Sequence, residues 1–307
     1  MEGSDAALKL LHRHPQGCHC FGGGTDLPSF TKSNLGIVIN LAINLRSHVT
    51  LYTGEDLFSV DNNVFPTNAK PELFYKILTE FKKGSMHHVR FESSADAVIG
   101  AGLGTSGSSS VALIKAVYKT IGVEPTRKAI AEQAFNIENK LWNTGRQDVY
   151  ASAYGGMNIM HFGKIIDVEP IPKLWAENIK KHLFLFYLGG VRKPQPKSLT
   201  NLLEIKKLAK EAINNLSNPE ALGRLLNTAW ELKKQSNPNV SNGRIDKIYD
   251  LAINAGALGG KVCGSGGAGY IIFMTSDKKQ LVKALKQEGI EEVDYDIDYN
   301  GVEARII

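Results

Sequence analysis

The sequence has few cysteines and lacks a long apolar segment. Only three cysteines occur in 307 residues, Cys18, Cys20 and Cys263. They do not form a disulfide framework, so reduced thiols and a cytoplasmic location are expected. The longest apolar runs, residues 35–45 and 182–191, are too short or too interrupted by Asn and Gly to cross a bilayer. The first residues lack the apolar core of a signal peptide. Neither a membrane protein nor a secreted disulfide scaffold is expected.

Blocks of like charge are also lacking. The 36 Lys and Arg residues outnumber the 31 Asp and Glu residues, which gives a net charge of +5, but the basic residues are spread along the chain. Charge therefore gives no indication of a nucleic-acid partner, and it is compatible with an anionic small-molecule substrate. Apolar residues make up 43% of the chain, enough for the core of one large domain or two smaller ones. A homodimer is compatible with this composition.

The residue pattern predicts an α+β protein with two lobes, divided near residue 165 into domains 1–165 and 166–307. Runs of β-branched and apolar residues predict strands at 35–53, 87–93, 183–189 and 270–274. Apolar residues at helical spacing predict helices at 71–83, 111–121, 126–142, 199–215, 218–236, 243–256 and 277–288.

Residues 100–110 read GAGLGTSGSSS and lead directly into an apolar-patterned helix. A flexible linker would join domains instead of beginning a helix. The first N–H groups of a helix have no intrahelical partner, and the helix dipole adds partial positive charge there. The stretch therefore predicts an anion-binding loop suited to phosphate. An ordinary serine-capped helix after a glycine turn is the alternative.

Two familiar kinds of phosphate loop do not fit this stretch. A Walker A loop ends in Gly-Lys-Ser/Thr, whereas the nearest following lysine, Lys115, lies inside the predicted helix. The dinucleotide-binding pattern G-x-G-x-x-G occurs twice, at 102–107 and at 264–269. The first copy precedes two helices and the second precedes a strand, whereas a Rossmann unit needs a helix followed by a strand that carries an acid. A nicotinamide-dependent dehydrogenase is therefore not favoured.

Two acidic residues follow the glycine-rich stretch. Glu138 falls in the apolar sector of helix 126–142, where a carboxylate needs a partner. A bound Mg²⁺ would be one such partner, and a buried salt bridge is the alternative. Asp148 is expected in a glycine-bounded turn beside Arg146, which would keep its carboxylate ionised. An ionised Asp can accept a hydroxyl proton during phosphoryl transfer, although a plain turn or helix-capping role is the alternative.

Near the N-terminus, residues 21–30 read FGGGTDLPSF. Three glycines before Thr25 and Asp26 suit hydrogen bonding of a polyol hydroxyl, and they equally suit a tight turn closed by the acid. Upstream lie five side chains that are metal ligands in other proteins: His12, His14, Cys18, His19 and Cys20. Their spacing matches no closed zinc motif, so a zinc site is the lesser interpretation of this segment.

Together, the segments GGGTDLPSF, VIGAGLGTSGS and KVCGSGGAGYIIF resemble the motifs of the GHMP superfamily of small-molecule kinases. With GRQDVYASAYGG, they most resemble its branch acting on D-glycero-D-manno-heptose 7-phosphate. The resemblance implies ATP- and Mg²⁺-dependent phosphorylation of a sugar phosphate at its anomeric hydroxyl, by direct in-line transfer. The implied fold has an N-terminal lobe like ribosomal protein S5 domain 2 and a ferredoxin-like C-terminal lobe. A GHMP kinase for an unphosphorylated sugar or another alcohol, and a kinase-like binding protein without catalysis, are the alternatives.

The resemblance also implies roles for individual residues. The residues expected around the ATP phosphates are Gly102, Leu103, Gly104, Thr105, Ser106, Gly107 and Ser108. Ser106 and Glu138 would hold Mg²⁺, and Asp148, with Arg146 beside it, would act on the attacking hydroxyl. The residues expected near the sugar are Gly23, Gly24, Thr25, Asp26 and Arg192. The turn at 264–269 would brace the phosphate loop.

One segment departs from the family pattern. The strand before GGGTD usually resembles R-A-P-L-R-I-S-F-F, whereas residues 13–21 read RHPQGCHCF. Arg13 and Pro15 match, but Gly17 replaces the second arginine and the strand alternation is lost. If the sequence is genuine, this departure puts the first strand and one anion-binding arginine in doubt, and catalysis would then be weak or absent. A reading-frame shift just before Phe21 is one hypothesis, which resequencing the 5′ end of the gene would test.

Overall fold

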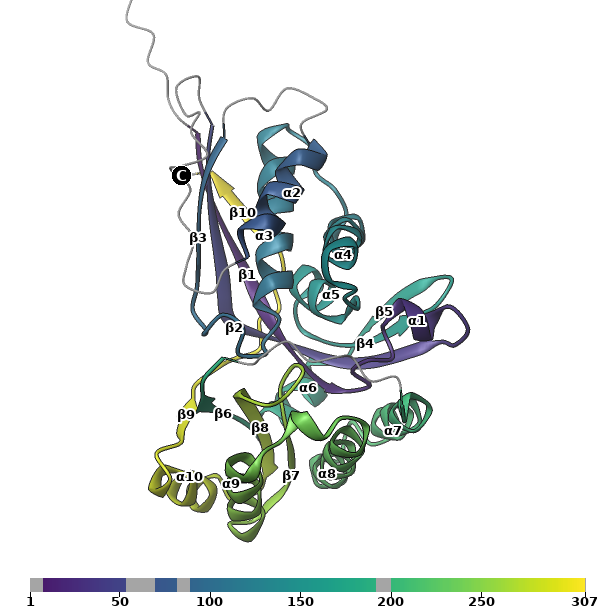
Figure 1. The fold of residues 1–307 in the computed structure, drawn as a ribbon, viewed down its shortest axis with the longest axis vertical. Helices are drawn as coiled ribbons and strands as arrows, with labels where there is room; N and C mark the ends of the chain where they lie inside the picture. The colour runs from purple at the N-terminus through teal and green to yellow at the C-terminus, as the bar shows by residue number, and fades with distance from the viewer. Residues whose placement is uncertain (1–7, 54–69, 82–88, 192–199, 307) are drawn as a thin grey trace, which may run out of the picture.

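The computed structural model describes residues 8–53, 70–81, 89–191 and 200–306. Two lobes, each built on an antiparallel sheet, lie one above the other (Figure 1). The strands are β1 (Leu8–Phe21), β2 (Gly36–Thr53), β3 (Val89–Ala95), β4 (Met157–Phe162), β5 (Ile166–Pro170), β6 (Leu183–Gly189), β7 (Ala257–Val262), β8 (Gly269–Thr275), β9 (Glu291–Val293) and β10 (Glu303–Ile306). Among the described residues, none of the helices has the length and apolar character needed to cross a membrane.

Most helices lie within a few residues of their predicted ranges. They are α1 (Pro28–Thr31), α2 (Pro71–Phe81), α3 (Thr105–Thr120), α4 (Arg127–Trp142), α5 (Gln147–Tyr154), α6 (Lys173–Lys180), α7 (Leu202–Asn214), α8 (Pro219–Ser236), the 3-10 helix η2 (Pro238–Val240), α9 (Gly243–Asn254) and α10 (Lys278–Gln287). The short helices α5 and α6 were not predicted. An eight-residue helix has only about two turns, which is too short for a clear apolar periodicity. Glycines on both sides of α5 further weaken the helical pattern there.

The first lobe is a six-stranded sheet in the order β10-β1-β2-β4-β5, with β3 paired to the second half of β2. Helices α2 to α5 cover one face of this sheet (Figure 1). The apolar side chains between them form one core, which includes Phe91, Val111, Ile137 and Tyr150. This packing places the start of α3 at the end of the lobe that faces the second lobe.

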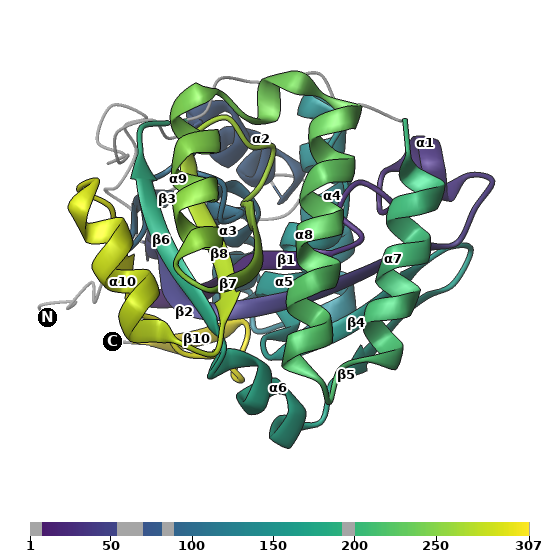
Figure 2. The ribbon, with the colours of Figure 1, turned by 90° about the horizontal axis from the view of Figure 1, so that it is seen from below.

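The second lobe is a four-stranded sheet in the order β7-β8-β6-β9. Helices α8, α9 and α10 pack against it around a core that includes Phe186, Trp230 and Phe273. Seen from below, α7 and α8 lie across β1 and β2 (Figure 2). The second face of the first sheet is therefore buried against the second lobe.

The first sheet takes strands from both sides of residue 165. The turn between β4 and β5 contains that residue, and β10 brings the C-terminal segment back to pair with β1. Arg46 on β2 forms ion pairs with Asp298 and Glu303 in the returning segment. The part of the chain after residue 165 therefore contributes two strands, β5 and β10, to the first sheet.

The first strand, which the sequence pattern had put in doubt, is present in full as β1. It pairs with β2 from Leu8 to Phe21, with register shifts after Pro15 and His19. At Gly17 a Cβ would lie 2.7 Å from the Cβ of Ala151, so the backbone leaves no space for an arginine in this position. Backbone pairing with the 18-residue β2 holds the strand despite its irregular side-chain pattern.

Candidate functional site

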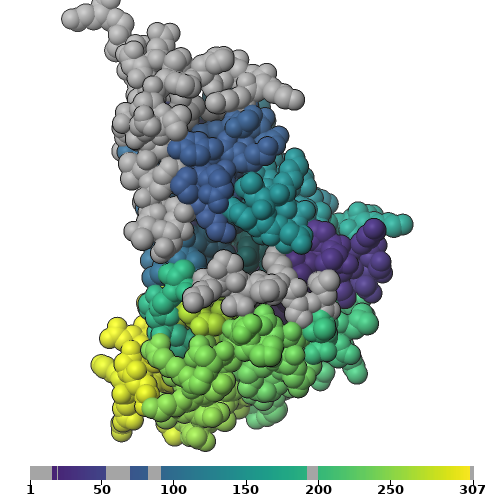
Figure 3. Space-filling model, in the orientation of Figure 1, coloured from purple at the N-terminus to yellow at the C-terminus, as the bar shows by residue number. Residues whose placement is uncertain are grey.

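A cavity of about 510 Å³ lies between the two lobes. The space-filling view shows a hollow below the blue and teal helices of the first lobe (Figure 3). Its lining comes from the start of α3, the loop after β1, the turn before α5, helices α7 and α8, and the turn at 264–265. The three glycine-rich segments, which are far apart in the sequence, therefore all line this cavity.

The start of α3 forms one wall of this cavity. Gly104 has φ 70°, in the left-handed region that favours glycine, and the helix begins at the next residue, Thr105. The first turn carries no acidic residue. The Thr105 hydroxyl is buried without a hydrogen-bond partner among the described residues, and Thr105 lines the cavity. Helix N–H groups, the helix dipole and this hydroxyl together make the wall suited to an anion.

The second lobe and β1 hold this loop in place. The backbone N–H of Tyr270 donates to Ala101 O at 3.1 Å, and the Tyr270 hydroxyl accepts from Val98 N at 3.2 Å. Gly17 N donates to Leu103 O at 3.1 Å. A Cβ at Gly269 would lie 2.0 Å from Ala101 O. The predicted contact between the two glycine-rich segments is therefore present, and it requires glycine at this position.

Asp148 rests against the start of α3. It lies in the first turn of α5 and not in an irregular turn. A Cβ at Gly104 would lie 3.1 Å from both Cβ and Cγ of Asp148, and a Cβ at Gly107 would lie 3.2 Å from Asp148 Cβ. All three residues line the cavity. The structure therefore brings this carboxylate to the anion-binding wall.

Glu138 reaches the same wall from α4. Its side chain is buried, and Oε1 accepts a hydrogen bond from the Ser110 hydroxyl at 2.5 Å. Ser110 lies one helical turn after Ser106, so the two serines share a face of α3. Ser106 and Glu138 both line the cavity, and their oxygens are of the kind that Mg²⁺ prefers.

The described part of the chain has no group of three or more His, Cys, Asp or Glu side chains arranged to hold a metal ion by themselves. A divalent cation beside Ser106 and Glu138 would therefore need oxygens from a ligand as well. The side chains of His12, His14 and His19 lie outside the described residues, so the lesser zinc interpretation stays untested.

Asp26 joins the loop after β1 to the start of α5. Its carboxylate is buried, accepting from Gly24 N at 3.1 Å and from Gln147 N at 2.9 Å. A Cβ at Gly145 would lie 2.0 Å from Asp26 Oδ2. Gly23, Gly24 and Asp26 line the cavity. This acid therefore fixes the helix that carries Asp148 and also faces the cavity.

Several residues named from the sequence have other surroundings. The Arg146 guanidinium donates to Glu132 Oε1 at 2.9 Å and lies 3.8 Å from the centroid of the Phe135 ring, so it is directed towards α4. The Thr25 hydroxyl binds backbone atoms of Gly22 and Ile37. Arg146, Thr25, Leu103 and Ser108 are not among the residues that line the cavity. Arg192 lies outside the described residues.

Other lining residues were not named from the sequence: Lys70, Trp142, Thr144, Lys233 and Lys261. Lys70 Nζ lies 3.8 Å from the centroid of the Trp142 ring. The Thr144 hydroxyl is buried without a hydrogen-bond partner among the described residues. Lys233 lies on the amphipathic helix α8, where a lysine ordinarily indicates the solvent face, so sequence alone carried no signal for it.

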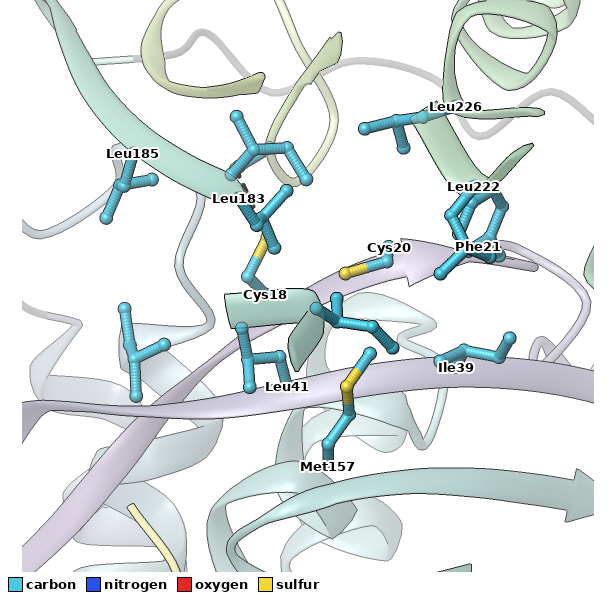
Figure 4. Close-up of a cluster of buried hydrophobic side chains, with 14 of the residues drawn as sticks. Cys18, Cys20, Phe21, Ile39, Leu41, Met157, Leu183, Leu185, Leu222 and Leu226 are labelled. Atoms are coloured by element: carbon cyan, nitrogen blue, oxygen red, sulfur yellow. Dashed lines mark hydrogen bonds between the residues drawn. The ribbon is translucent and has the colours of Figure 1, made fainter. Parts of the chain in front are cut away.

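The three cysteines lie in one buried cluster that also contains side chains of both lobes. The Sγ atoms of Cys18 and Cys263 are 3.5 Å apart, and Cys18 and Cys20 project from β1 among apolar side chains of both lobes (Figure 4). Hydrogen bonds from Cys20 and Cys263 lower the pKa of the Cys18 thiol. The same bonds, and then burial, raise the pKa of Cys20 and Cys263. All three are free thiols.

Comparison with known families identifies the class of protein. The family profile described as GHMP kinases N terminal domain matches residues 72–156, and that described as GHMP kinases C terminal matches residues 205–291. The chain belongs to the GHMP kinase family and is a phosphotransferase with an alcohol group as acceptor. The two-lobed α+β fold implied by the sequence motifs is confirmed. Kinases of this family depend on ATP.

Several similar proteins are kinases that act on sugars or sugar phosphates. The chain is 29% identical to the D-glycero-alpha-D-manno-heptose 7-phosphate kinase of Campylobacter jejuni, over 92% of this chain and 95% of that protein. The solved structure of a protein from Campylobacter jejuni, described as a sugar kinase, is 28% identical and superposes with a TM-score of 0.78 over 99% of this chain and 100% of that one.

A D-glycero-D-manno-heptose 1-phosphate kinase from Bacteroides thetaiotaomicron shares the fold, with a TM-score of 0.78 and 22% identity over 97% of this chain and 99% of that one. The chain is thus a GHMP-family kinase that is similar to heptose phosphate kinases.

Proposed function

We propose that the protein transfers the γ-phosphoryl group of ATP to the anomeric hydroxyl of D-glycero-D-manno-heptose 7-phosphate. The packing of Asp148 against the start of α3 carries the proposal, because it puts a carboxylate beside an anion-binding helix terminus in one cavity. Similarity to the Campylobacter jejuni kinase over nearly the whole chain supports this choice of acceptor. We place the reaction in the cytoplasm, which supplies ATP and keeps thiols reduced.

The triphosphate would bind at the start of α3. Residues 104–107 would donate backbone N–H groups to it, and the Thr105 hydroxyl would gain the hydrogen-bond partner that it lacks among the described residues. Ser106 and Glu138 are the side chains that would hold Mg²⁺, with the remaining ligands coming from phosphate and water. When bound, Mg²⁺ would neutralise charge on the β- and γ-phosphates.

Asp148 would act on the acceptor hydroxyl. The hydroxyl oxygen attacks the γ-phosphorus and the bond to the leaving ADP oxygen breaks, while the hydroxyl proton passes to Asp148. No covalent enzyme intermediate is needed. Positioning and charge neutralisation supply most of the rate in such reactions. The carboxylate of Asp148, held against the helix terminus, supplies the positioning.

The sugar would lie between the loop after β1 and the turn before α5. Gly23 and Gly24 bring backbone close to the cavity, and Asp26 would accept a hydrogen bond from a sugar hydroxyl. The Thr144 hydroxyl, which lacks a partner among the described residues, would bond a second one. Arg146 would act indirectly, because its contact with Glu132 holds the turn that precedes Asp148.

A substrate panel tests this proposal. Purified protein would be incubated with ATP, Mg²⁺ and one acceptor at a time: heptose 7-phosphate, unphosphorylated heptose, galactose, fucose, homoserine or mevalonate. We expect ADP release to be fastest with heptose 7-phosphate, and ³¹P NMR of the product to show a new phosphate on the anomeric carbon. Faster ADP release with an unphosphorylated acceptor would show that this acceptor, and not heptose 7-phosphate, is the substrate. Nucleotide binding without turnover of any acceptor would indicate a binding protein.

A further inference from the structure

We propose that Cys18 and Cys263 are a modification site, where a peroxide forms a reversible disulfide that links the two lobes and weakens nucleotide binding. The disulfide would lie beside the phosphate loop, residues 100–107. Neither thiol is among the residues that line the cavity, and neither has a part in the phosphoryl transfer proposed above. Only the effect on nucleotide binding rests on the proposed function, because it requires the triphosphate to bind at this loop.

The two sulfur atoms are already in contact. The Sγ atoms of Cys18 and Cys263 are 3.5 Å apart, and both residues are free thiols. A disulfide bond is about 2 Å long, so the sulfurs need to approach by only about 1.5 Å. Cys18 lies on β1 in the first lobe, and Cys263 directly follows β7 in the second. Their disulfide would therefore be a covalent link between the lobes.

Cys20 is the poorer partner for Cys18, because both belong to the same strand. Cα atoms two residues apart in a strand are separated by about 6.6 Å. That separation is close to the upper limit of about 6.8 Å that a disulfide spans without strain. The expected disulfide therefore joins Cys18 to Cys263, and Cys20 provides a control within the same cluster.

The segments that carry the two thiols hold the phosphate loop from both sides. Next to Cys18, Gly17 N donates to Leu103 O at 3.1 Å. From the other side, a Cβ at Gly102 would lie 2.8 Å from Cys263 O, so the backbones are in close contact there. Drawing the two sulfurs together would press these segments against the loop. A misplacement of about 1 Å in a binding site can cost on the order of 100-fold.

Cys18 would be the attacking sulfur. Hydrogen bonds from Cys20 and Cys263 lower the pKa of its thiol, and the thiolate is the reactive form. It attacks one peroxide oxygen, the O–O bond breaks, and the sulfenic acid forms as the second oxygen leaves as hydroxide, which takes up the Cys18 proton. The Cys263 sulfur then attacks the Cys18 sulfur, the S–O bond breaks, and the oxygen leaves with the Cys263 proton as water. Two thiols are oxidised to one disulfide, and hydrogen peroxide is reduced to two waters.

Burial decides when this reaction occurs. Cys18 is 3% exposed and Cys263 is 1% exposed, so peroxide reaches them when the interface between the lobes opens. The cavity also lies between the lobes and is lined by residues of both. A nucleotide bound there would hold the interface closed and slow the oxidation. The disulfide would therefore form mainly in protein that has no nucleotide bound.

Peptide mapping of the wild-type protein tests the site directly. The protein would be treated with hydrogen peroxide, the remaining thiols alkylated in urea, and the digest analysed by mass spectrometry without reduction. We expect a peptide pair linked through Cys18 and Cys263, which disappears after treatment with dithiothreitol. Calorimetric titration with a non-hydrolysable ATP analogue and Mg²⁺ would measure the effect on nucleotide binding. We expect the affinity to fall on the order of 10- to 100-fold on oxidation and to recover on reduction.

Single substitutions assign the effect to the pair. Cys18→Ser and Cys263→Ser each remove one sulfur of the pair, and Cys20→Ser is the matched control, because Cys20 is equally buried on the same strand as Cys18. We expect peroxide to weaken binding of the analogue in wild type and in Cys20→Ser, and to have no effect in the other two variants. Melting temperatures of the reduced proteins would show that each variant folds, and the wild-type peptide map does not depend on them.

Several results would overturn the proposal. The absence of a linked peptide pair, or a link through Cys20, would refute the site. A mapped Cys18–Cys263 disulfide with unchanged affinity for the analogue would refute its effect on nucleotide binding, and so would an equal loss of affinity in oxidised Cys263→Ser. A reduced wild-type protein that binds the analogue but phosphorylates no acceptor would refute the proposed function alone, because neither the peptide map nor the titration uses an acceptor.

Discussion

Gly104 and Asp148 are in direct contact across the cavity wall: a Cβ at Gly104 would lie 3.1 Å from the Asp148 Cγ. The turn before α3 and the first turn of α5 therefore leave no space between them for another side chain. The helix terminus attracts a bound phosphate, whereas the carboxylate is an acceptor for a hydroxyl proton. Their contact therefore sets the place where a hydroxyl can approach a bound phosphate. The predictions below follow from this arrangement.

Gly104→Ala should damage the site more than it damages the fold. The new methyl group would press on Asp148, and alanine is strained at φ 70°. Gly122→Ala is the matched control, since Gly122 also has φ 70° and has nothing within 4 Å of its Cβ position. We expect both variants to lose about 1 kcal/mol of stability, but only Gly104→Ala to lose most of its turnover. Equal turnover in the two variants would contradict the contact.

Glu138→Gln should raise the Mg²⁺ requirement. The amide is nearly the same size and can still accept from the Ser110 hydroxyl, but it is a weaker ligand for a hard cation. The Mg²⁺ concentration for half-maximal rate at saturating ATP would be compared with that of Glu132→Gln. Glu132 is also on α4 but bonds Arg146 and Tyr150. An unchanged Mg²⁺ requirement in Glu138→Gln would remove this residue from the metal site.

The three thiols should report opening of the lobes. Cys18, Cys20 and Cys263 are at most 3% exposed and lie between the lobes, so a thiol reagent can reach them only when the interface opens or the chain unfolds. We expect slow labelling of the native protein, slower labelling with ATP and Mg²⁺, and fast labelling in urea. Complete labelling of native protein within the mixing time would show that this interface is not closed in solution.

Stability should fall at alkaline pH. Burial raises the pKa of Tyr295, whose hydroxyl donates to Leu183 O at 2.8 Å, and it also raises the pKa of Tyr150 and Tyr249. A raised pKa in the folded state means that the neutral forms stabilise the fold fully below the unfolded-state pKa of about 10, and that this stabilisation is lost as pH rises further. Urea unfolding measured from neutral to alkaline pH would test this. Tyr295→Phe should flatten the decline.

Local sequence signals predicted the long helices well. Residues 126–142 were expected to be helical, and α4 runs from Arg127 to Trp142 because Thr126 caps its first turn through a hydrogen bond to Ala129 N. The start of α3 was expected later, since serines and Gly107 weaken the apolar pattern there. The sequence pattern left β1 in doubt because its pairing with β2 is a long-range interaction that the alternation of side chains does not reveal.

The candidate site was predictable where glycines indicate backbone turns and where helical phase places Glu138 on the apolar face of α4. Motif spacing correctly indicated a loop at the start of α3 and a second glycine-rich turn in contact with it. Because Arg146 is close to Asp148 in the sequence, we expected their side chains to lie together. Residues two positions apart at a helix start point in different directions, and Arg146 contacts α4 instead. Thr144, Lys233 and Lys261 reach the cavity through packing of the two lobes, which no local pattern encodes.

Asp148→Asn tests the central claim most directly, because the amide fills the same space but cannot accept a proton. We expect the melting temperature and the affinity for ATP to stay at wild-type values while kcat falls on the order of 10²- to 10⁴-fold. Turnover equal to that of wild type, with heptose 7-phosphate as acceptor, would show that the carboxylate touching Gly104 takes no part in the reaction.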